Sequence, residues 1–445
     1  MRRRRHWLAA ALALVVALPP VARAGDTVDR SGPLRARTGG GNIVTHLTGE
    51  GTASLYEALH WLGARLGRVN SYGWRDLQRK PTPTDFDAAM LEAYRNGITP
   101  VVLLEYEGSY QFLDPPQPIG SYADWFAAGR ATAERFRPGG SFAAEHGIKG
   151  WGATVFTAIN EPDVQNTIPK DAYREALRGL ADGVHSVDPA LRVLPGGFAS
   201  CNSHQDATLR GYGPAIRDLL EDGRLDGLDL HTYYHPRWFP ITKDRSFSAQ
   251  SCFDRIASAL KLTRPINFYA TEFNIARVEA WADPKLAAKL FLTALWDQFG
   301  VVGRDGRSSA TVLAMPWYLA DTGRIEGPAY AMAGAEGPWR PDPRADVLRI
   351  VLDLAGDMRF IELDPLHAGT FLLEGERGRL HVWQNLPGWT DRPGRDLTLD
   401  VPDWATRAEV WAWDGLRRRI PAVGTGRLHI PDLPAGETIM VYLPR

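Results

Sequence analysis

The sequence feature that most constrains the fold is the stretch 151–162, which reads WGATVFTAINEP. Its first part is an unbroken run of apolar, aromatic and β-branched residues, which is typical of a strand covered on both faces of a parallel sheet. The run stops abruptly at Asn160, Glu161 and Pro162. Because α/β sheets keep their chemistry beyond the carboxyl ends of their strands, the stretch predicts an acidic side chain at that edge.

A second stretch has the same form. Residues 265–274, PINFYATEFN, are a strand-like run with Glu272 near its carboxyl end. An isolated glutamate would most often be a solvated loop residue or half of an ion pair. Two strand-terminal glutamates in one chain instead indicate chemistry that uses paired carboxylates.

Between about residues 42 and 356, strand-like and helix-like segments alternate eight times in this chain of 445 residues. The alternation predicts an α/β fold of the (β/α)8 TIM barrel type. A doubly wound sheet is disfavoured because no glycine-rich phosphate cradle follows any strand. The predicted strands are 42–47, 64–70, 100–106, 151–162, 192–197, 225–234, 265–274 and 310–317. The predicted helices are 54–63, 85–96, 122–136, 171–187, 214–221, 252–262, 284–299 and 344–354.

From Phe360 onward the pattern changes to short alternating runs separated by turn residues, which predicts a C-terminal antiparallel β-sandwich. Its predicted strands are 369–374, 380–384, 397–401, 408–412, 427–430 and 438–442. The expected division of the chain is a signal peptide at 1–24, an N-terminal arm at 25–37, a catalytic barrel at 38–357 and the sandwich at 358–445. Pairing with the sandwich is one option for the arm.

The first 24 residues have the three parts of a secretory signal peptide. These are a basic start at 2–5, an apolar segment at 8–18 and the cleavage pattern Ala22-Arg23-Ala24. A permanent membrane anchor is the alternative, but the apolar segment is too short to span a bilayer. We therefore expect a secreted or periplasmic protein, with no membrane span after cleavage.

The charge balance excludes one class of partner. The chain has 51 Lys and Arg against 52 Asp and Glu, and removal of the five Arg in residues 1–24 changes the net charge from −1 to about −6. A mildly acidic exported protein without a basic run is not expected to bind nucleic acid.

The two cysteines, Cys201 and Cys252, allow a disulfide in an exported protein, and free buried thiols are the alternative. Their spacing does not fit a structural zinc site, and no H-E-x-x-H pattern occurs. We expect neither a metal nor a cofactor.

Glycoside hydrolysis is a reaction that needs two carboxyl groups, one to protonate the leaving oxygen and one to attack or stabilise the anomeric carbon. In a closed barrel the ends of the fourth and seventh strands face each other across the mouth, so Glu161 and Glu272 could approach one bond. A separation of about 5–5.5 Å gives retention, and a wider gap admits a water molecule and gives inversion.

With five further residues, the pair resembles the clan A retaining glycoside hydrolases. The five are Arg68, Asn160, His231, Tyr233 and Trp317. The barrel-plus-sandwich layout is most similar to family 39, which contains β-xylosidases, iduronidases and bacterial exopolysaccharide hydrolases. The resemblance covers nearly the whole mature chain in architecture, and its specificity lies in the joint occurrence of Asn160-Glu161 and Glu272.

The resemblance implies roles for the three central residues. Glu161 resembles the general acid/base, and Glu272 resembles the nucleophile. Asn160 resembles the residue that donates to the sugar 2-hydroxyl. On physical grounds, a neighbouring Arg and hydroxyl should favour the ionised form of a nucleophilic carboxylate.

The resemblance also implies supporting roles. Tyr233 resembles the tyrosine that bonds the nucleophile, His231 and Arg68 resemble residues around the two glutamates, and Trp317 resembles the aromatic floor under the sugar. Plainer alternatives are barrel packing for Trp317 and a satisfied strand-end histidine for His231. For Arg68, the nearby Arg65 and Arg75 are rivals. The rival carboxylates are Glu105, Glu107, Asp163, Asp229 and Glu279, of which Glu105 is the candidate for substrate binding.

The expected substrate is a polysaccharide or oligosaccharide, cleaved at β-linked bonds. Among the fifteen tryptophans, those in predicted loops on the catalytic side indicate an elongated aromatic cleft. They are Trp74, Trp238, Trp281 and Trp339. Two other classes stay open, namely a catalytically silent carbohydrate-binding protein and a transglycosylase that assembles polysaccharide.

Overall fold

The computed structural model places most of the chain after the N-terminal segment. It describes residues 32–44, 58–71, 85–105, 119–163, 168–199, 211–234, 248–275, 283–304, 309–317, 343–365, 369–385, 396–413, 417–421, 426–433 and 436–445. The predicted signal peptide, Cys201 and the four loop tryptophans named above lie outside these residues. Within them, no helix combines the length and apolar character that crossing a bilayer requires.

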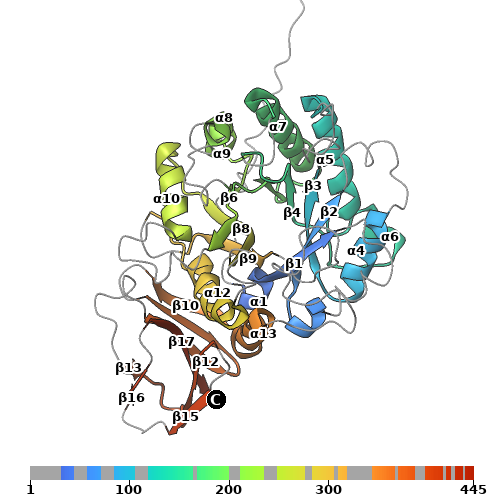
Figure 1. Cartoon of the computed structure of the whole chain (residues 1–445). Coiled ribbons are helices and arrows are strands. Elements are labelled where there is room, and N and C mark those ends of the chain that lie inside the picture. The colour runs from blue at the N-terminus through green and yellow to red at the C-terminus, as the bar shows by residue number, and fades with distance from the viewer. Residues whose placement is uncertain are drawn as a thin grey trace, which may run out of the picture.

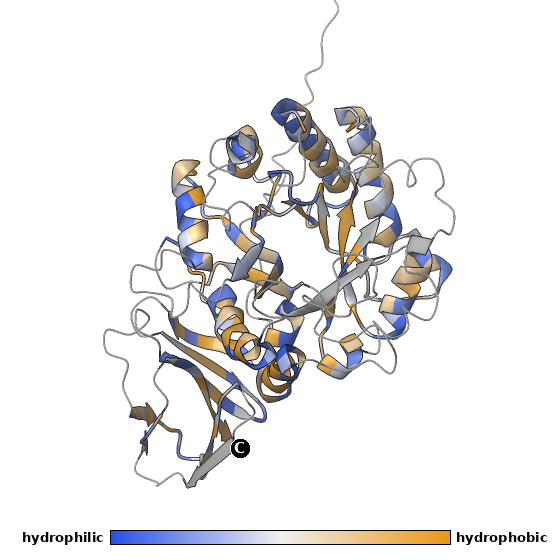
Figure 2. Cartoon of the chain, in the orientation of Figure 1, coloured by the Kyte–Doolittle hydropathy of each residue, from blue (hydrophilic) through white to orange (hydrophobic). Residues whose placement is uncertain are grey.

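A five-stranded parallel sheet forms the first half of the molecule, in the order β1-β2-β3-β4-β5 (Figure 1). Its strands are β1 (Gly39–Val44), β2 (Leu66–Ser71), β3 (Thr99–Leu104), β4 (Val155–Ala158) and β5 (Arg192–Pro195). The described residues of β3 and β4 are almost all buried, and Figure 2 shows these strands as mainly hydrophobic. The sequence run that suggested a doubly covered parallel strand therefore does form one.

A second parallel sheet is built around β8 (Asn267–Ile275), which pairs with β6 (Gly227–Asp229), β7 (Thr232–Tyr234) and β9 (Thr311–Pro316). The prediction of one continuous strand over 225–234 was wrong. β6 and β7 are separate, because Leu230 pairs with Phe198, beyond the end of β5. At the other edge Thr38, just before β1, pairs with Ala314 of β9, so the two sheets are linked at both edges.

Side chains alternate between the two faces of these sheets. The inward set comes from strands of both sheets and forms one apolar cluster of Leu66, Val101, Val155, Leu194, Tyr269, Val312, Leu313 and Met315. The outward set packs against the helices, as Val102, Phe156, Val193 and Phe268 do. Because strands of both sheets contribute side chains to this one cluster, the two sheets enclose a common interior.

Helices cover the outer faces of the strands (Figure 1). The main ones are α4 (Asp85–Arg95), α5 (Tyr122–Phe136), α7 (Lys170–Val187), α10 (Ala249–Ala259), α12 (Pro284–Phe299) and α13 (Pro343–Ala355). Shorter ones are α1 (Leu34–Arg37), α6 (Ser141–Glu145), α8 (Gly213–Ala215) and α9 (Arg217–Glu221). Cys252 is buried on α10 and is disulfide-bonded, which favours the disulfide over the free thiol.

The described part of the N-terminal arm is helical. Within α1, the Leu34 N–H donates to Met358 O at 2.8 Å and the Arg35 N–H donates to Gly356 O at 2.7 Å. The Arg35 side chain also donates to Gly63 O and Leu352 O. These bonds fasten the start of the described chain to the end of α13.

The C-terminal part is antiparallel. One sheet has the order β10-β11-β12-β17-β14-β15, and β13 pairs with β16. The strands are β10 (Arg359–Asp364), β11 (Thr370–Gly375), β12 (Gly378–Asn385), β13 (Leu397–Asp400), β14 (Arg407–Trp411), β15 (Arg417–Pro421), β16 (Arg427–Ile430) and β17 (Glu437–Pro444). β10 and β15 were not predicted from the sequence. Polar contacts that join this part to α12 include Thr293 to Thr438 at 2.8 Å, Lys289 to Glu437 at 2.7 Å, and Gln384 to Thr293 O at 3.2 Å.

Candidate active site

Glu161 is placed by a sharp turn directly after β4. Ile159 has a φ of 64° and Glu161 a φ of 45°, a left-handed conformation that is costly for residues with side chains and is common at functional sites. The turn is fixed because Ile159 N–H donates to Leu104 O at 3.1 Å and Glu161 N–H donates to Gly196 O at 2.9 Å. A Cβ on Gly196 would lie 1.6 Å from Ile159 O, so only glycine allows this close approach.

Asn160, between these two residues, is held through both its backbone and its side chain. Its N–H donates to Glu105 Oε1 at 3.1 Å, and its Oδ1 accepts from Arg68 Nη1 at 3.4 Å. Glu105 is only 2% exposed. Glu105 therefore helps hold the Asn160 turn through this bond; its substrate-binding role stays a prediction.

Glu272 is brought into the interior by a bulge in β8. Between Tyr269 and Phe273 this strand has one residue more than β6 and β7, and between Ala270 and Phe273 it has one more than β9. Successive strand residues normally face opposite sides. The extra residue lets both Thr271 and Glu272 point inward, while Phe273 turns outward and stacks on Phe291 of α12 at 5.7 Å.

The Glu272 carboxylate is bound by side chains from two other strands. Arg68 of β2 donates from Nη2 to its Oε1 in a buried ion pair, and Tyr233 of β7 donates to its Oε2 at 2.7 Å. Burial alone would raise the pKa of Glu272. The positive charges of His231 and Arg68 outweigh that effect and hold the pKa below its ordinary value, so the carboxylate is ionised near neutral pH.

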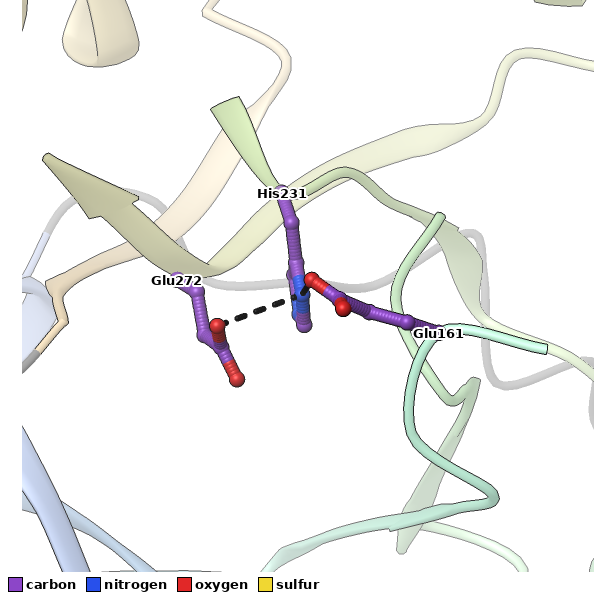
Figure 3. Close-up of side chains that lie close together, drawn as sticks. All are labelled: Glu161, His231 and Glu272. Carbon is purple, nitrogen blue, oxygen red and sulfur yellow. Dashed lines mark hydrogen bonds and ion pairs between the residues drawn. The ribbon is translucent and has the colours of Figure 1, made fainter. Parts of the chain in front are cut away.

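His231 lies between the two glutamates, as Figure 3 shows. Its Nδ1 is 2.8 Å from Glu161 Oε1 and 3.5 Å from Glu272 Oε2. Burial opposes the charge on the ring, but the carboxylates of Glu272 and Glu161 raise the pKa of His231 to about 9. A Cβ on Gly197 would lie 2.0 Å from the ring, so glycine at that position makes room for the histidine.

Trp317 follows β9 at the same edge and is half-buried. Its N–H donates to Phe273 O at 2.9 Å, and its carbonyl accepts from the Asn274 amide. The Arg68 guanidinium carbon lies 5.6 Å from the centre of its ring. This position, beside the Arg68–Glu272 pair, is compatible with either a sugar platform or packing on the arginine.

The structure thus gathers all seven residues singled out from the sequence at the carboxyl ends of the parallel strands. Two further members, Asp229 and Thr271, were not singled out as part of the site. Asp229, named from the sequence only as a rival carboxylate, had a signal, since it stands two residues before His231 in the same predicted strand. Thr271 had none, because strict alternation would place it on the face opposite Glu272.

A metal ion is the alternative use of such a cluster. One ligand atom each from Glu161, His231 and Glu272 lie within 4.8 Å of one another. A metal needs a neutral imidazole and available carboxylate oxygens. Here the guanidinium of Arg68 and the hydroxyl of Tyr233 bind the two Glu272 oxygens, and the raised pKa of His231 favours a protonated ring. The cluster therefore fits acid–base work better than metal binding.

Segments 72–84, 106–118, 235–247, 276–282 and 318–342, which follow β2, β3, β7, β8 and β9 in the chain, lie outside the described residues. At the opposite ends of the strands there is a cavity of about 380 Å³, bordered by Arg65, Thr99 and Arg192 among others. It contains none of the site residues.

No protein-family model matches the sequence, and neither does any curated protein. Solved structures do match in fold, at low sequence identity. A glucosidase from Croceicoccus marinus superposes with a TM-score of 0.57 at 13% identity, covering 95% of this chain and 98% of that one. A family 51 α-L-arabinofuranosidase from Bifidobacterium longum has a TM-score of 0.57 at 14% identity, covering 94% and 98%.

A family 86 glycoside hydrolase variant in complex with neoagarooctaose has a TM-score of 0.55 at 11% identity, covering 92% of this chain and 77% of that one. The chain therefore has the α/β fold seen in these glycoside hydrolases. The substrates in their names differ, so the shared fold does not define a sugar or a linkage.

Proposed function

We propose that this protein is a retaining glycoside hydrolase that cleaves O-glycosidic bonds in a polysaccharide or oligosaccharide. The observation that carries the proposal is the approach of two strand-end carboxylates: an oxygen of Glu161 and one of Glu272 lie within 4.8 Å of each other, with His231 between them. This approach favours retention, which goes with a separation of about 5–5.5 Å between the carboxyl groups, over inversion, which goes with roughly 6.5–9.5 Å.

The proposed scaffold is a closed (β/α)8 barrel of the clan A type, followed by a β-sandwich. Closure is supported by the backbone pairs Phe198–Leu230 and Thr38–Ala314, which link the two parallel sheets at both edges. It is also supported by the interior cluster that both sheets share. Within clan A we propose family 39, whose layout the chain resembles from the barrel to the sandwich.

In the proposed mechanism Glu272 attacks the anomeric carbon while Glu161 gives a proton to the leaving oxygen. The bond from Glu272 to the sugar forms as the glycosidic bond breaks. In the second step water attacks the same carbon, Glu161 takes a proton from the water, and the bond to Glu272 breaks. Arg68 and Tyr233 keep Glu272 ionised before attack. Asn160, whose Oδ1 accepts from Arg68, is proposed to donate from its NH2 to the sugar 2-hydroxyl, as the resemblance to clan A implies.

The finer details of substrate and location belong to the same proposal. We infer a β-linked substrate from the resemblance to family 39, and export from the signal-like residues 1–24. Mass spectrometry of the mature protein from the exported fraction should show an N-terminus after Ala24. Retention of residues 1–24 in that fraction would contradict cleavage.

The experiment is hydrolysis of a panel of aryl β-glycosides and polysaccharides by the wild type, Glu161→Gln and Glu272→Gln. Glu272→Gln should abolish turnover, and Glu161→Gln should lose most activity on substrates with poor leaving groups. Proton NMR of the first-formed product should show the anomeric configuration of the substrate. Glu409→Gln is the matched control, because Glu409 is a buried glutamate of the C-terminal sheet and is 2% exposed.

The outcomes separate the competing functions. Undiminished activity in both site variants would overturn the roles of the glutamates. Oligosaccharide products longer than the substrate would indicate a transglycosylase. Binding of a polysaccharide without turnover, with equal affinity in the wild type and both variants, would favour a silent carbohydrate-binding protein.

A further inference from the structure

Two buried polar residues lie behind the glutamates and have no role in the mechanism above. Asp229 of β6 is fully buried, and Thr271 of β8 is 1% exposed. Neither could reach a substrate. Since uncompensated buried polar groups are costly, their arrangement calls for a physical explanation.

Asp229 determines the direction of the hydrogen bonds around Thr271. The Thr271 N–H donates to Asp229 Oδ1 at 3.0 Å, and the Thr271 hydroxyl donates to Asp229 Oδ2 at 2.7 Å. A hydroxyl has one hydrogen and two lone pairs. With its hydrogen on Asp229, Thr271 Oγ1 can only accept from its other neighbours.

Those neighbours are the two cations of the site. His231 Nε2 lies 3.0 Å from Thr271 Oγ1, and Arg68 Nη1 donates to the same oxygen at 3.3 Å. His231 Nε2 must therefore carry a hydrogen. Nδ1 is then the one ring nitrogen whose protonation can change, and it is the nitrogen that faces Glu161 and Glu272.

We propose that Asp229 and Thr271 form a positioning relay that holds His231 as an Nε2–H donor, with Nδ1 directed toward Glu161. Through its bond to Arg68, Thr271 also helps to fix the Arg68 guanidinium beside Glu272. The relay acts through His231 and Arg68 and touches no substrate. The bulge in β8 is what makes it possible, because it turns Thr271 and Glu272 inward together. The consequence for catalytic rate rests on the proposed glycosidase function, whereas the consequence for the His231 ring does not.

The charged and titratable neighbours of His231 come from every strand packed around it. Among the described residues, Glu161, Asp229 and Glu272 act directly on the charge of the ring. Arg68 and Tyr233 bind Glu272, and Glu105 interacts with Arg68. Their balance decides the titration of the ring, so the test must change one of them without reshaping the rest. Asp229→Asn does this with nearly the same volume.

Asp229→Asn should reverse the direction of the hydrogen bonds between residue 229, Thr271 and His231. The Asn Oδ1 can still accept from the Thr271 N–H, and its NH2 then donates to Thr271 Oγ1, so the hydroxyl hydrogen must point toward His231 Nε2. We expect nitrogen-15 NMR of histidine-labelled protein, assigned with His231→Asn, to show the neutral His231 ring changing from the Nε2–H to the Nδ1–H tautomer. The matched control is Asp226→Asn, because Asp226 is a buried aspartate next to β6 that bonds Tyr269 and Asn267 instead.

Thr271→Val and Thr271→Ser provide a second, independent pair. Thr271→Val keeps the shape but removes the acceptor, so the pKa of His231 should fall by about one unit. Thr271→Ser restores the hydroxyl and should return the titration to within a few tenths of a unit of wild type. Thr132→Val controls for loss of a buried hydroxyl, since Thr132 is on α5, away from the site, and its hydroxyl donates to Ala128 O of the same helix at 2.7 Å.

If the protein hydrolyses a glycoside, Asp229→Asn should lower kcat by about a hundredfold or more with little change in KM, as expected for an imidazole held in the wrong tautomer. An unchanged His231 tautomer in Asp229→Asn, or an unchanged titration in Thr271→Val, would overturn the relay while the glycosidase stands. A wild type inactive on every substrate would count against the proposed function, and the NMR comparison would still decide the relay.

Discussion

Glu161 and Glu272 occupy equivalent places, beyond the carboxyl ends of β4 and β8, but different parts of the chain hold them. At Glu161 the backbone supplies the constraint, through two left-handed residues and a close approach to Gly196. Its carboxylate bonds to His231, whose own proton can change. At Glu272 side chains supply the constraint, through the permanent charge of Arg68 and the hydroxyl of Tyr233.

The difference matches what two roles in one reaction would require. A carboxylate beside a permanent cation keeps its negative charge, which suits a nucleophile. A carboxyl group beside a titratable histidine can exchange a proton without leaving an uncompensated charge in the interior, which suits an acid/base. Substitutions that remove the contacts of Glu272 or of Glu161 should therefore have different effects, and the largest is expected at Glu272.

Replacing Arg68 with Met should have the largest effect, because it leaves the buried Glu272 charge without its cation. We expect the free energy of unfolding to fall by about 3–5 kcal/mol and glycosidase activity to be lost. Urea unfolding followed by circular dichroism measures the first effect. Arg135→Met is the control, because it breaks a partly buried pair with Asp87 away from the site and should leave activity unchanged. Equal loss of stability in both variants would contradict the idea that the buried Glu272 carboxylate depends on Arg68.

The pH dependence of stability tests His231, the titratable partner of Glu161 that also lies beside Glu272. The pKa of His231 is raised from 6.5 to about 9 in the folded protein, so its stabilising contribution is complete below pH 6.5 and is lost as the pH rises through about 9. The shift corresponds to about 3 kcal/mol. Unfolding measured from pH 6 to pH 10 should show this loss in the wild type and in His146→Asn, an exposed-histidine control, but not in His231→Asn. A parallel decline in all three proteins would show that His231 does not cause the pH dependence.

Gly196→Ala should disturb the turn that holds Glu161. Its Cβ would lie 1.6 Å from Ile159 O, so the backbone must move, at a cost of about 2–3 kcal/mol. Because Glu161 moves with the turn, acid/base activity should fall more than substrate affinity. Gly32→Ala, where an added Cβ meets nothing within 4 Å, should leave both stability and activity at the wild-type level.

Tyr233→Phe should have the smallest effect on stability, about 1 kcal/mol, because it removes one hydrogen bond from Glu272 and leaves the ion pair. The pKa of Glu272 should rise, so the acidic limb of the pH–rate profile should move to higher pH, with kcat reduced about tenfold. Tyr122→Phe removes a comparable bond, to Asp182 at 2.9 Å on the outer helices. If it shifted the acidic limb equally, the role of Tyr233 would be wrong.

Where local chemistry marks a boundary, the sequence predicted it closely. The predicted helix 122–136 has the bounds of α5, with Ser121 and Asp124 forming a capping box, and 284–299 has the bounds of α12, capped by Asp283 before Pro284. The predicted start at 252 missed the first residues of α10, because the Ser248–Ser251 box was not recognised. Glu161, Asn160 and Glu272 could be found because each stands near the end of a predicted strand, and strand ends in a parallel sheet converge. Arg68, His231, Tyr233 and Trp317 were found through the resemblance to the clan A enzymes.

What could not be predicted depends on register between strands. The bulge in β8 has no glycine or proline to mark it, and strict alternation from Tyr269 would have turned Glu272 outward. The division of β6 from β7 depends on a pairing with Phe198, about thirty residues away. The relay of Asp229 and Thr271 depends on both features, so it became visible only in three dimensions.

The bonds between α12 and the C-terminal sheet couple the unfolding of the C-terminal part to that of the parallel sheets. On one side α12 stacks on β8 through Phe291 and Phe273, and on the other it bonds through Thr293 and Lys289 to β17. Heat that loosened the sheet would remove the outer support of the helix behind Glu272. The two parts should therefore melt in a single calorimetric transition, and a chain cut short after α13 should lose its activity well before it loses its helices.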